Sequence, residues 1–359
     1  MILTRPQCRI NFLLLAPVLA LVGTGLLFVY SASSGYTRNY LPRQAMWVVL
    51  GICAAVPTAL VNVRVYRHYA APLFVCGVLG LLAVLLVGEE RNGAKSWLGF
   101  GSLGIQPSEF AKLAVIIMFG RYLAEFEEHR YDYRYYGVSF LILFIPLLLI
   151  LLQPDLGTAL VFMPVVFAMF YVSGTRQGLL ATTFLAGAAC MPLLWMVMSD
   201  RQKQRILLTW QPELDPTRVG YQAIQSKLAV GSGQITGRGF LNSLQCKLNF
   251  LPERHTDFVY SVICEEWGLM GGMLVLALYV CVILVAFYIA RTAKDIFSEV
   301  VAVGIAVMLA THVVMNIGMT VGLLPIIGLP LPFVSYGGSA MLTTLMAVGI
   351  LQSIYAADL

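Results

Sequence analysis

Long apolar segments limit the folds open to this sequence more than any other feature. Runs of about 17 to 25 residues with few charges are long enough to cross the hydrocarbon core of a bilayer as α-helices. In a bilayer only helices and closed barrels satisfy every backbone polar group. We therefore expect an all-α polytopic integral membrane protein with about ten transmembrane helices. They are expected near residues 11–31, 44–62, 71–88, 108–124, 137–152, 156–173, 177–198, 258–290, 298–322 and 334–356.

The composition agrees with this class of protein. Of the 359 residues, 59% are hydrophobic and 11% are charged, whereas about 25% are charged in an average soluble protein. The net charge of +5 comes from residues scattered through loops, so no nucleic-acid partner is expected. Most of the seven cysteines lie in apolar segments, and the four histidines are far apart. Neither a disulfide framework nor a histidine metal site is therefore expected.

The basic residues predict the orientation of the chain. An even number of spans places both termini on one side of the membrane, and short cytoplasmic loops are enriched in Arg and Lys. The short loops on the side of the termini carry Arg5, Arg9, Arg64, Arg67, Arg121, Arg130, Arg134, Arg176, Arg291 and Lys294. We therefore expect cytoplasmic termini.

The segment 199–256 then lies outside as one long extracellular loop. Residues 206–208, 221–230 and 240–250 interleave apolar and basic side chains, a pattern typical of short amphipathic helices on a membrane surface. We expect residues 1–359 to form a single transmembrane domain that includes this loop.

Four of the expected helices start on the outer side with a polar signature. Each signature alone is typical of an ordinary helix start. Four on one face of the membrane indicate a functional surface, and their positive dipole ends suit an anionic phosphate. The signatures lie at residues 106–109, 153–157, 255–257 and 333–339.

Asp257 is the strongest catalytic candidate. It lies where the long polar loop meets the apolar run that starts at Val259. One interpretation is that Thr256 or Asp257 caps the helix. The other is that the Asp257 carboxylate is a general base that takes a proton from a substrate hydroxyl. The two roles do not exclude each other.

Other ionisable residues lie inside the expected spans, where each is costly unless it faces protein or water. Glu109 and Lys112 are spaced as an i,i+3 ion pair. On a helical projection Glu265 lies nearer than Glu266 to the face of Asp257, so Glu265 is the better candidate to share its cavity. A further polar stripe is expected to bind helices together by hydrogen bonds. It contains His312, Asn316 and Thr320.

These features together suit a lipid-linked substrate with an anionic head, such as a polyprenyl pyrophosphate. Transfer from such a carrier needs a base for the attacking hydroxyl and positive charge on the leaving group. Arginine, lysine or a bound divalent cation such as Mg²⁺ or Mn²⁺ could provide that charge. No cofactor is certain from the residues.

Several motifs in combination resemble the SEDS family of cell-wall proteins (shape, elongation, division and sporulation) over essentially the whole chain. The form of residues 250–258 and 318–325 is more similar to the rod-shape branch of that family than to its division branch. The motifs are QPSEFAK at 106–112, QPDLGTA at 153–159, GYQAIQS at 220–226, FLPERHTDF at 250–258, EEWG at 265–268 and PLPFVSYGGS at 330–339.

The resemblance implies a peptidoglycan glycosyltransferase of the bacterial plasma membrane that polymerises lipid II at the outer face. Its implied partner is a class B penicillin-binding protein. The family's essential aspartate falls on Asp257, which would deprotonate an acceptor sugar hydroxyl, with inversion at the donor carbon and release of undecaprenyl pyrophosphate. Glu109 and Lys112 match family cavity residues. The other substrate-binding or cavity candidates are Lys95, Arg254, His255, Glu265 and Ser335.

This chain departs from the family pattern at two positions. Many relatives carry a second basic residue in the segment 93–97, so a substrate contact there rests on Lys95 alone. Ala340 stands where relatives often have serine, so no hydroxyl role is expected at that position.

The sequence is also compatible with two other functions. A lipid II translocase would place its binding groups near the bilayer midplane between repeated halves, whereas most acids and bases here lie at outer helix ends. A scaffold that only holds a penicillin-binding partner would tolerate replacement of Asp257 by Asn.

Overall fold

The computed structural model describes residues 9–34, 39–91, 94–99, 104–129, 132–215 and 219–357. A helix occupies each of the ten ranges expected from the apolar runs, so the prediction of an all-α polytopic membrane protein is confirmed. These helices are α1 (Phe12–Ser33), α2 (Leu41–Leu60), α3 (Val63–Val87), α4 (Pro107–Glu125), α5 (Tyr133–Leu152), α6 (Leu156–Val172), α7 (Gln177–Val197), α11 (Val259–Thr292), α12 (Ile296–Thr320) and α13 (Gly338–Ala357).

The long helices differ in how readily they would cross a bilayer. Among the described residues, seven helices are long and apolar enough to do so: α1, α2, α3, α5, α11, α12 and α13. Shorter apolar helices lie at Leu156–Val172 and Gln177–Ala189. Four charged residues interrupt α4, and such a helix is tolerated in a membrane only where protein surrounds it. They are Glu109, Lys112, Arg121 and Glu125.

Capping side chains explain where several helices begin. Asn62 accepts a hydrogen bond from the Arg64 amide at 2.9 Å, so α3 starts at Val63, well before the apolar run that predicted it. Asp155 and Asp295 cap α6 and α12 in the same way. A side-chain oxygen at this position satisfies an amide that the first helical turn leaves free.

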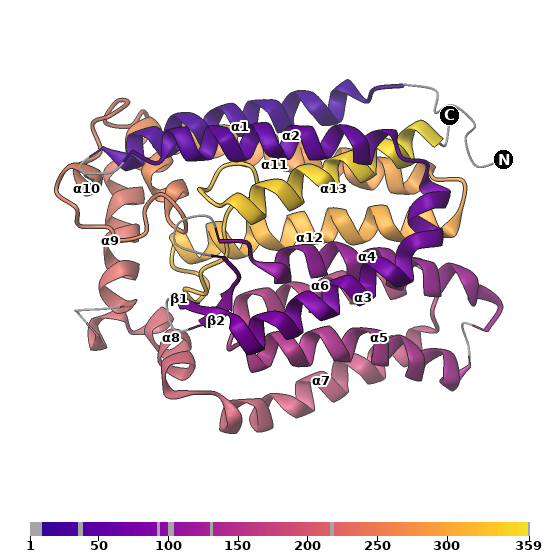
Figure 1. The fold of residues 1–359 in the computed structure, drawn as a ribbon. Helices are drawn as coiled ribbons and strands as arrows, with labels where there is room; N and C mark the ends of the chain where they lie inside the picture. The colour runs from indigo at the N-terminus through magenta and orange to yellow at the C-terminus, as the bar shows by residue number, and fades with distance from the viewer. Residues whose placement is uncertain are drawn as a thin grey trace.

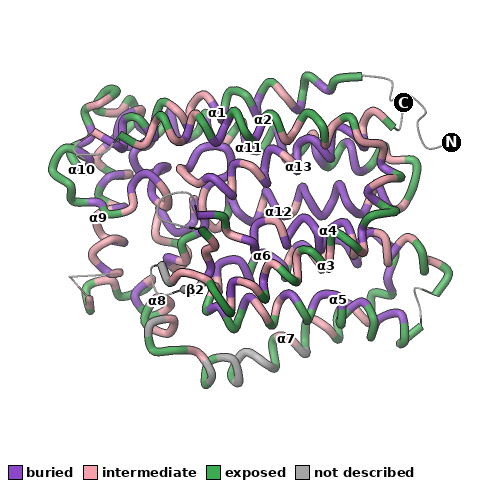
Figure 2. Tube along the Cα trace, viewed as in Figure 1, coloured by how far each residue is buried: buried purple, intermediate pink, exposed green. Residues whose placement is uncertain are grey.

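Helix α12 forms the centre of the bundle and is buried along most of its length (Figure 2). It packs against α4, α6 and α11, while α13 packs against α2. By contrast, α1 and α3 leave one side exposed. Apolar side chains exposed on the outside and polar ones inside are expected where lipid is the solvent.

The two ends of the bundle differ in character. The start of α1 and the end of α13 lie at one end, as expected for an even number of spans (Figure 1). The opposite end, which we call the loop end, carries the segment 199–258 with α8 (Asp200–Trp210), η2 (Pro212–Leu214), α9 (Val219–Ser232) and α10 (Leu244–Lys247). Helices α4, α6, α11 and α13 all begin at the loop end, so the four polar signatures do share one face.

Two features of the loop end differ from the sequence-based expectation. The third amphipathic stretch, 240–250, is mostly irregular, and α10 is a single turn of four residues. A two-stranded antiparallel hairpin, β1 (Glu89–Arg91) and β2 (Ala94–Trp97), was not predicted. The backbone of Lys95 lies on β2, and its side chain lies outside what the structure describes.

Helix α11 is broken near its loop end. Gly268 has φ 66° and ψ −164°, which interrupts the helical ladder. The segment 234–239 supplies substitute hydrogen bonds at the break. The Leu269 amide donates to the Gln234 carbonyl at 2.8 Å, and the Gly239 amide donates to the Glu266 carbonyl at 2.9 Å. The break therefore leaves few backbone groups without a partner.

Gly25 provides a test of this packing. A Cβ added at Gly25 of α1 would lie 2.6 Å from the Phe333 carbonyl oxygen, whereas a Cβ at Gly23 would meet nothing within 4 Å. We expect Gly25→Ala to lower the free energy of unfolding by about 1–3 kcal/mol through overpacking. Gly23→Ala should leave it unchanged or raise it by up to about 1 kcal/mol, because alanine favours helix.

Thermal unfolding of the two purified variants in detergent measures this difference. Equal melting temperatures would show that α1 does not pack tightly against residues 333–334.

Candidate functional site

Asp257 lies in an irregular turn that precedes α11. Its amide donates to the Glu253 carbonyl at 3.0 Å, and its carbonyl accepts a hydrogen bond from Nδ2 of Asn316 at 3.0 Å. The N-cap residue of α11 is Phe258, with no side-chain capping bond. The helix-capping interpretation of Asp257 is therefore not supported. The residue is partly exposed at the loop end.

The surroundings of Asp257 favour a carboxyl group that ionises near neutral pH. Burial of the carboxyl raises the pKa of Asp257 to about 7, and the Glu253 carboxylate adds to the rise. Arg205 of α8 and a hydrogen bond from Thr256 act in the opposite direction. A group with a pKa near the working pH is well suited to accept and release a proton.

Gly328 packs directly against the carboxyl of Asp257. A Cβ at Gly328, where φ is +70°, would lie 3.4 Å from Oδ2 of Asp257. The turn that contains Gly328 is held from below by α12, because Nδ2 of Asn316 also donates to the Leu329 carbonyl at 2.7 Å. One buried amide therefore holds the main chain of Asp257 against the turn that lines it.

Arg254 fastens this turn to the rest of the bundle. The side chain is fully buried, and it donates to the carbonyls of Ala32 at 2.7 Å and Ser34 at 3.0 Å and to Oδ1 of Asn249 at 2.9 Å. These contacts give Arg254 a structural role. The expected contact of Arg254 with a substrate stays a prediction.

His255 and Ser335 also belong to the supporting structure. The His255 ring stacks on Tyr40 at a centroid distance of 4.2 Å, and burial together with the Arg254 charge lowers the pKa of His255 to about 4. The Ser335 hydroxyl accepts a hydrogen bond from the Leu331 amide at 2.9 Å. His255 is thus neutral at physiological pH, and Ser335 stabilises the turn before α13.

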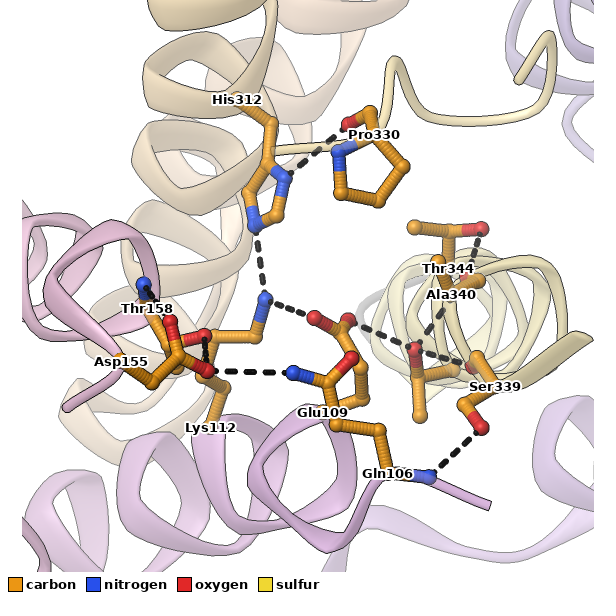
Figure 3. Close-up of polar contacts among 11 residues, drawn as sticks. Gln106, Glu109, Lys112, Asp155, Thr158, His312, Pro330, Ser339, Ala340 and Thr344 are labelled. Carbon is orange, nitrogen blue, oxygen red and sulfur yellow. Dashed lines mark hydrogen bonds and ion pairs between the residues drawn. The ribbon is translucent and has the colours of Figure 1, made fainter. Parts of the chain in front are cut away.

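Glu109 and Lys112 form the expected ion pair inside the bundle. Oε1 of Glu109 and Nζ of Lys112 are 2.8 Å apart, and both side chains are almost fully buried. Nε2 of His312 lies 2.7 Å from the same Nζ, and the other ring nitrogen of His312 lies 3.4 Å from the Pro330 carbonyl oxygen. Figure 3 shows Lys112 between Glu109 and His312, so α4 is joined to α12 through this lysine.

The polar stripe on α12 links this pair to Asp257. His312 reaches Pro330, and Asn316, one turn along, reaches Leu329 and Asp257. The prediction that the stripe binds helices together is confirmed only for His312, which contacts Lys112 of α4. Asn316 bonds to turn carbonyls, and the Thr320 hydroxyl donates to the Ile317 carbonyl of its own helix.

A second cluster in Figure 3 ties three helix starts together. Nε2 of Gln106 donates to Asp155 at 3.1 Å, and the Gln106 amide donates to the Ser339 hydroxyl at 2.9 Å. Asp155 also accepts a hydrogen bond from the Thr158 hydroxyl at 2.8 Å. These contacts connect α4, α6 and α13 at the loop end. Ala340, the position that departs from the family pattern, has only a methyl side chain here.

The structure does not bring Glu265 to Asp257. Its carboxylate accepts hydrogen bonds from the Ser243 hydroxyl at 2.5 Å and the Leu244 amide at 2.8 Å, so it holds the turn around α10. Glu266 accepts a hydrogen bond from Ser31 of α1, so it joins α11 to α1. The geometry therefore does not support a place for Glu265 in the Asp257 cavity.

The described residues include no group of three or more His, Cys, Asp or Glu side chains placed to hold a metal ion. The Glu253 carboxylate is near enough to Asp257 to raise the pKa of that carboxyl. A carboxylate of this kind suits a Mg²⁺ ion that takes its other ligands from water and substrate phosphates.

The sequence matches known proteins over almost its full length. Residues 12–358 match the model of the cell cycle protein family that comprises FtsW, RodA and SpoVE. The chain belongs to this family. It is the SEDS family, so the resemblance inferred from the motifs is confirmed.

Relatives within the SEDS family carry informative names. The chain is 39% identical to the peptidoglycan glycosyltransferase MrdB of Escherichia coli, over 94% of this chain and 91% of MrdB. It is 38% identical to a probable peptidoglycan glycosyltransferase FtsW of Trichlorobacter lovleyi, over 96% and 93% of the two chains. It also resembles a chain from a structure of a peptidoglycan synthase complex that coordinates polymerization and crosslinking. That match has a TM-score of 0.83 and 31% identity, over 97% of this chain and 98% of the other.

The Glu109–Lys112 pair yields a stability prediction. Removing one partner of a buried pair leaves an uncompensated charge and costs about 3–5 kcal/mol, so Glu109→Gln should strongly destabilise the protein. Arg121→Gln is a matched control, because it breaks a second pair on the same helix whose side chains are 29% and 45% exposed. Exposed pairs contribute about 0–1 kcal/mol.

Unfolding of both variants by heat or denaturant in detergent gives the comparison. A similar loss of stability in the two variants would contradict a special cost for the buried charge.

Proposed function

We propose that this chain is a peptidoglycan glycosyltransferase that polymerises lipid II with Asp257 as general base. The observation that carries the proposal is the environment of Asp257, a desolvated but partly exposed carboxyl group with a pKa of about 7. The family membership and the names of the relatives supply the reaction class.

The proposed reaction is a single displacement at the donor sugar. Asp257 takes the proton from the 4-hydroxyl of the acceptor sugar, and the freed oxygen forms a bond to the donor anomeric carbon. The bond from that carbon to the pyrophosphate breaks, and undecaprenyl pyrophosphate leaves with the bonding electrons. The configuration inverts, because attack comes from the side opposite the leaving group. Asp257 later returns its proton to water.

The fold supports this role by holding Asp257 rigidly. Asn316 fixes its carbonyl, Gly328 lines its carboxyl, and Arg254 anchors the turn. A general base contributes most to the reaction rate when its position is fixed before the substrate binds. A divalent cation held by Glu253 and substrate phosphates would supply positive charge toward the leaving group.

Location and partner follow from the same proposal. The charge bias of the short loops supports cytoplasmic termini, and thus an active site at the outer face of a bacterial plasma membrane. The relative in the peptidoglycan synthase complex supports a partner that crosslinks strands, here a class B penicillin-binding protein. The form of residues 250–258 and 318–325 supports a role in rod-shape elongation. The relatives named MrdB and FtsW are almost equally similar to this chain, at 39% and 38% identity.

The direct test is whether a minimal change at Asp257 abolishes polymerisation. Asp257→Asn keeps the size of the side chain but removes the base, and we expect a drop in rate of about 100-fold or more. The assay is synthesis of glycan strands from labelled lipid II by purified protein in nanodiscs, with and without the penicillin-binding partner. Asp295→Asn is the control, because Asp295 caps α12 at the opposite end.

The other two functions predict different results in this assay. Movement of lipid II across the bilayer without polymer would indicate a translocase. Polymerisation that occurs only with the partner and is unchanged in Asp257→Asn would leave only a supporting role for the chain.

The pH dependence of the rate tests the general-base role. The base must be ionised, so the rate should rise with pH through about 7 and level off above it. Removing the nearby negative charge in Glu253→Gln should lower the pKa of Asp257 and move the midpoint to lower pH. Initial rates measured from about pH 5 to 9 check both points. A midpoint unaffected by Glu253→Gln would assign the titration to another group.

A further inference from the structure

A narrow cleft at the loop end contains two positive charges. It lies between α8, α9 and the turn that follows α12, and Arg205, Lys227 and Thr209 contribute polar groups to it. Within the part of the chain that the structure describes, neither Arg205 nor Lys227 forms an ion pair or hydrogen bond through its side chain. Two like charges in one cleft repel each other, and an anion bound between them would relieve that repulsion.

The backbone holds the side chain of Lys227 in this cleft. Gly322 has φ +78°, and a Cβ there would lie 1.7 Å from Cε and 2.6 Å from Nζ of Lys227. The lysine thus lies directly over a glycine that leaves room for it. This close contact distinguishes Lys227 from a freely moving surface lysine.

The apolar surroundings indicate a ligand with a lipid part. The cleft is otherwise lined mainly by apolar side chains, namely Leu208, Val219, Ala223, Met319, Leu324 and Ile326. On α8 itself Trp210 is 81% exposed and Leu207 is 54% exposed. An amphipathic helix with an exposed tryptophan suits the boundary between headgroups and acyl chains. The two cations would then lie at the depth of lipid phosphates.

The cleft is also close to the proposed general base. Phe258, the residue after Asp257, packs in one apolar cluster with Ala223, Met319 and Ile326, which line the cleft. The charge of Arg205 also acts on the carboxyl of Asp257 and lowers its pKa. Helices α8 and α9, which carry Arg205 and Lys227, pack against each other. The cationic cleft and the carboxyl of Asp257 thus belong to one region of the loop end.

We propose that Arg205 and Lys227 form the binding site for the pyrophosphate of the polyprenyl-linked donor. This inference rests on the proposed function and identifies which substrate occupies the α8–α9 cleft. Arginine and lysine are the side chains that bind phosphate oxygens most strongly.

The closeness of the cleft to Asp257 favours the pyrophosphate of the donor, and not that of the acceptor, as the group that binds there. The carbon under attack carries the donor pyrophosphate, so that group must lie near the hydroxyl that Asp257 deprotonates. The pyrophosphate of the acceptor is separated from its reacting hydroxyl by the whole disaccharide. A cationic site next to the base therefore fits the leaving group, whose growing negative charge it would also stabilise.

Direct binding of the product tests this assignment without any catalysis. The probe is undecaprenyl pyrophosphate, titrated against purified full-length protein in nanodiscs of zwitterionic lipid, with no lipid II present. We expect Arg205→Gln and Lys227→Gln each to weaken binding about tenfold, which is typical of losing one charged hydrogen bond. Lys203→Gln, which removes a charge from α8 outside the cleft, should change binding less than about twofold.

Charge-conserving variants guard against a loss of binding through misfolding. Arg205→Lys and Lys227→Arg should bind within a few fold of the unchanged protein, and melting temperatures report the fold of every variant. Equal binding by the two cleft variants and Lys203→Gln would overturn the proposal. Equal competition by phosphatidylglycerol would also overturn it, because the cleft would then hold any anionic headgroup. Polymerisation is a separate measurement, so a failure of the proposed function is seen independently.

Discussion

The buried guanidinium of Arg254 is the interaction on which the site depends. A cation in the protein interior is stable only when its donors are satisfied, and here they meet two carbonyls at the end of α1 and the side chain of Asn249. These bonds fix an irregular segment that has no regular helical hydrogen bonds of its own. Asp257, three residues further on, is thereby held in place without being part of a helix.

The second support comes from α12. Asn316 is fully buried and both of its hydrogen bonds go to main-chain carbonyls of separate turns. His312 on the same face reaches Lys112, so the interior ion pair and the Asp257 turn share one rigid helix. In a low-dielectric interior such contacts are strong, and an unpaired group is costly. The polar groups of the bundle therefore favour one arrangement of the loop end.

Hydropathy predicted the helices because apolar length is a local property that a membrane imposes directly. Hydropathy placed the start of α3 too late, since the cap at Asn62 lies outside the apolar run.

The site was harder to predict than the helices. The helical projection that placed Glu265 near the face of Asp257 was wrong because Asp257 precedes the helix, so a rotation of 100° per residue does not apply to it. Arg254 was expected in the cavity, but residue type alone does not tell whether an arginine meets a substrate or a carbonyl. Arg205 and Lys227 are brought together only by the packing of α8 on α9.

The break in α11 has a consequence for how the chain assembles. The amide and carbonyl groups around Gly268 are completed by residues 234–239, which precede α11 in the chain. The segment that completes the helix therefore leaves the ribosome before the helix that needs it. When the first turns of α11 emerge, the segment 234–239 is already synthesised. The helix can therefore form hydrogen bonds with this segment at once, and its polar backbone groups do not stay exposed.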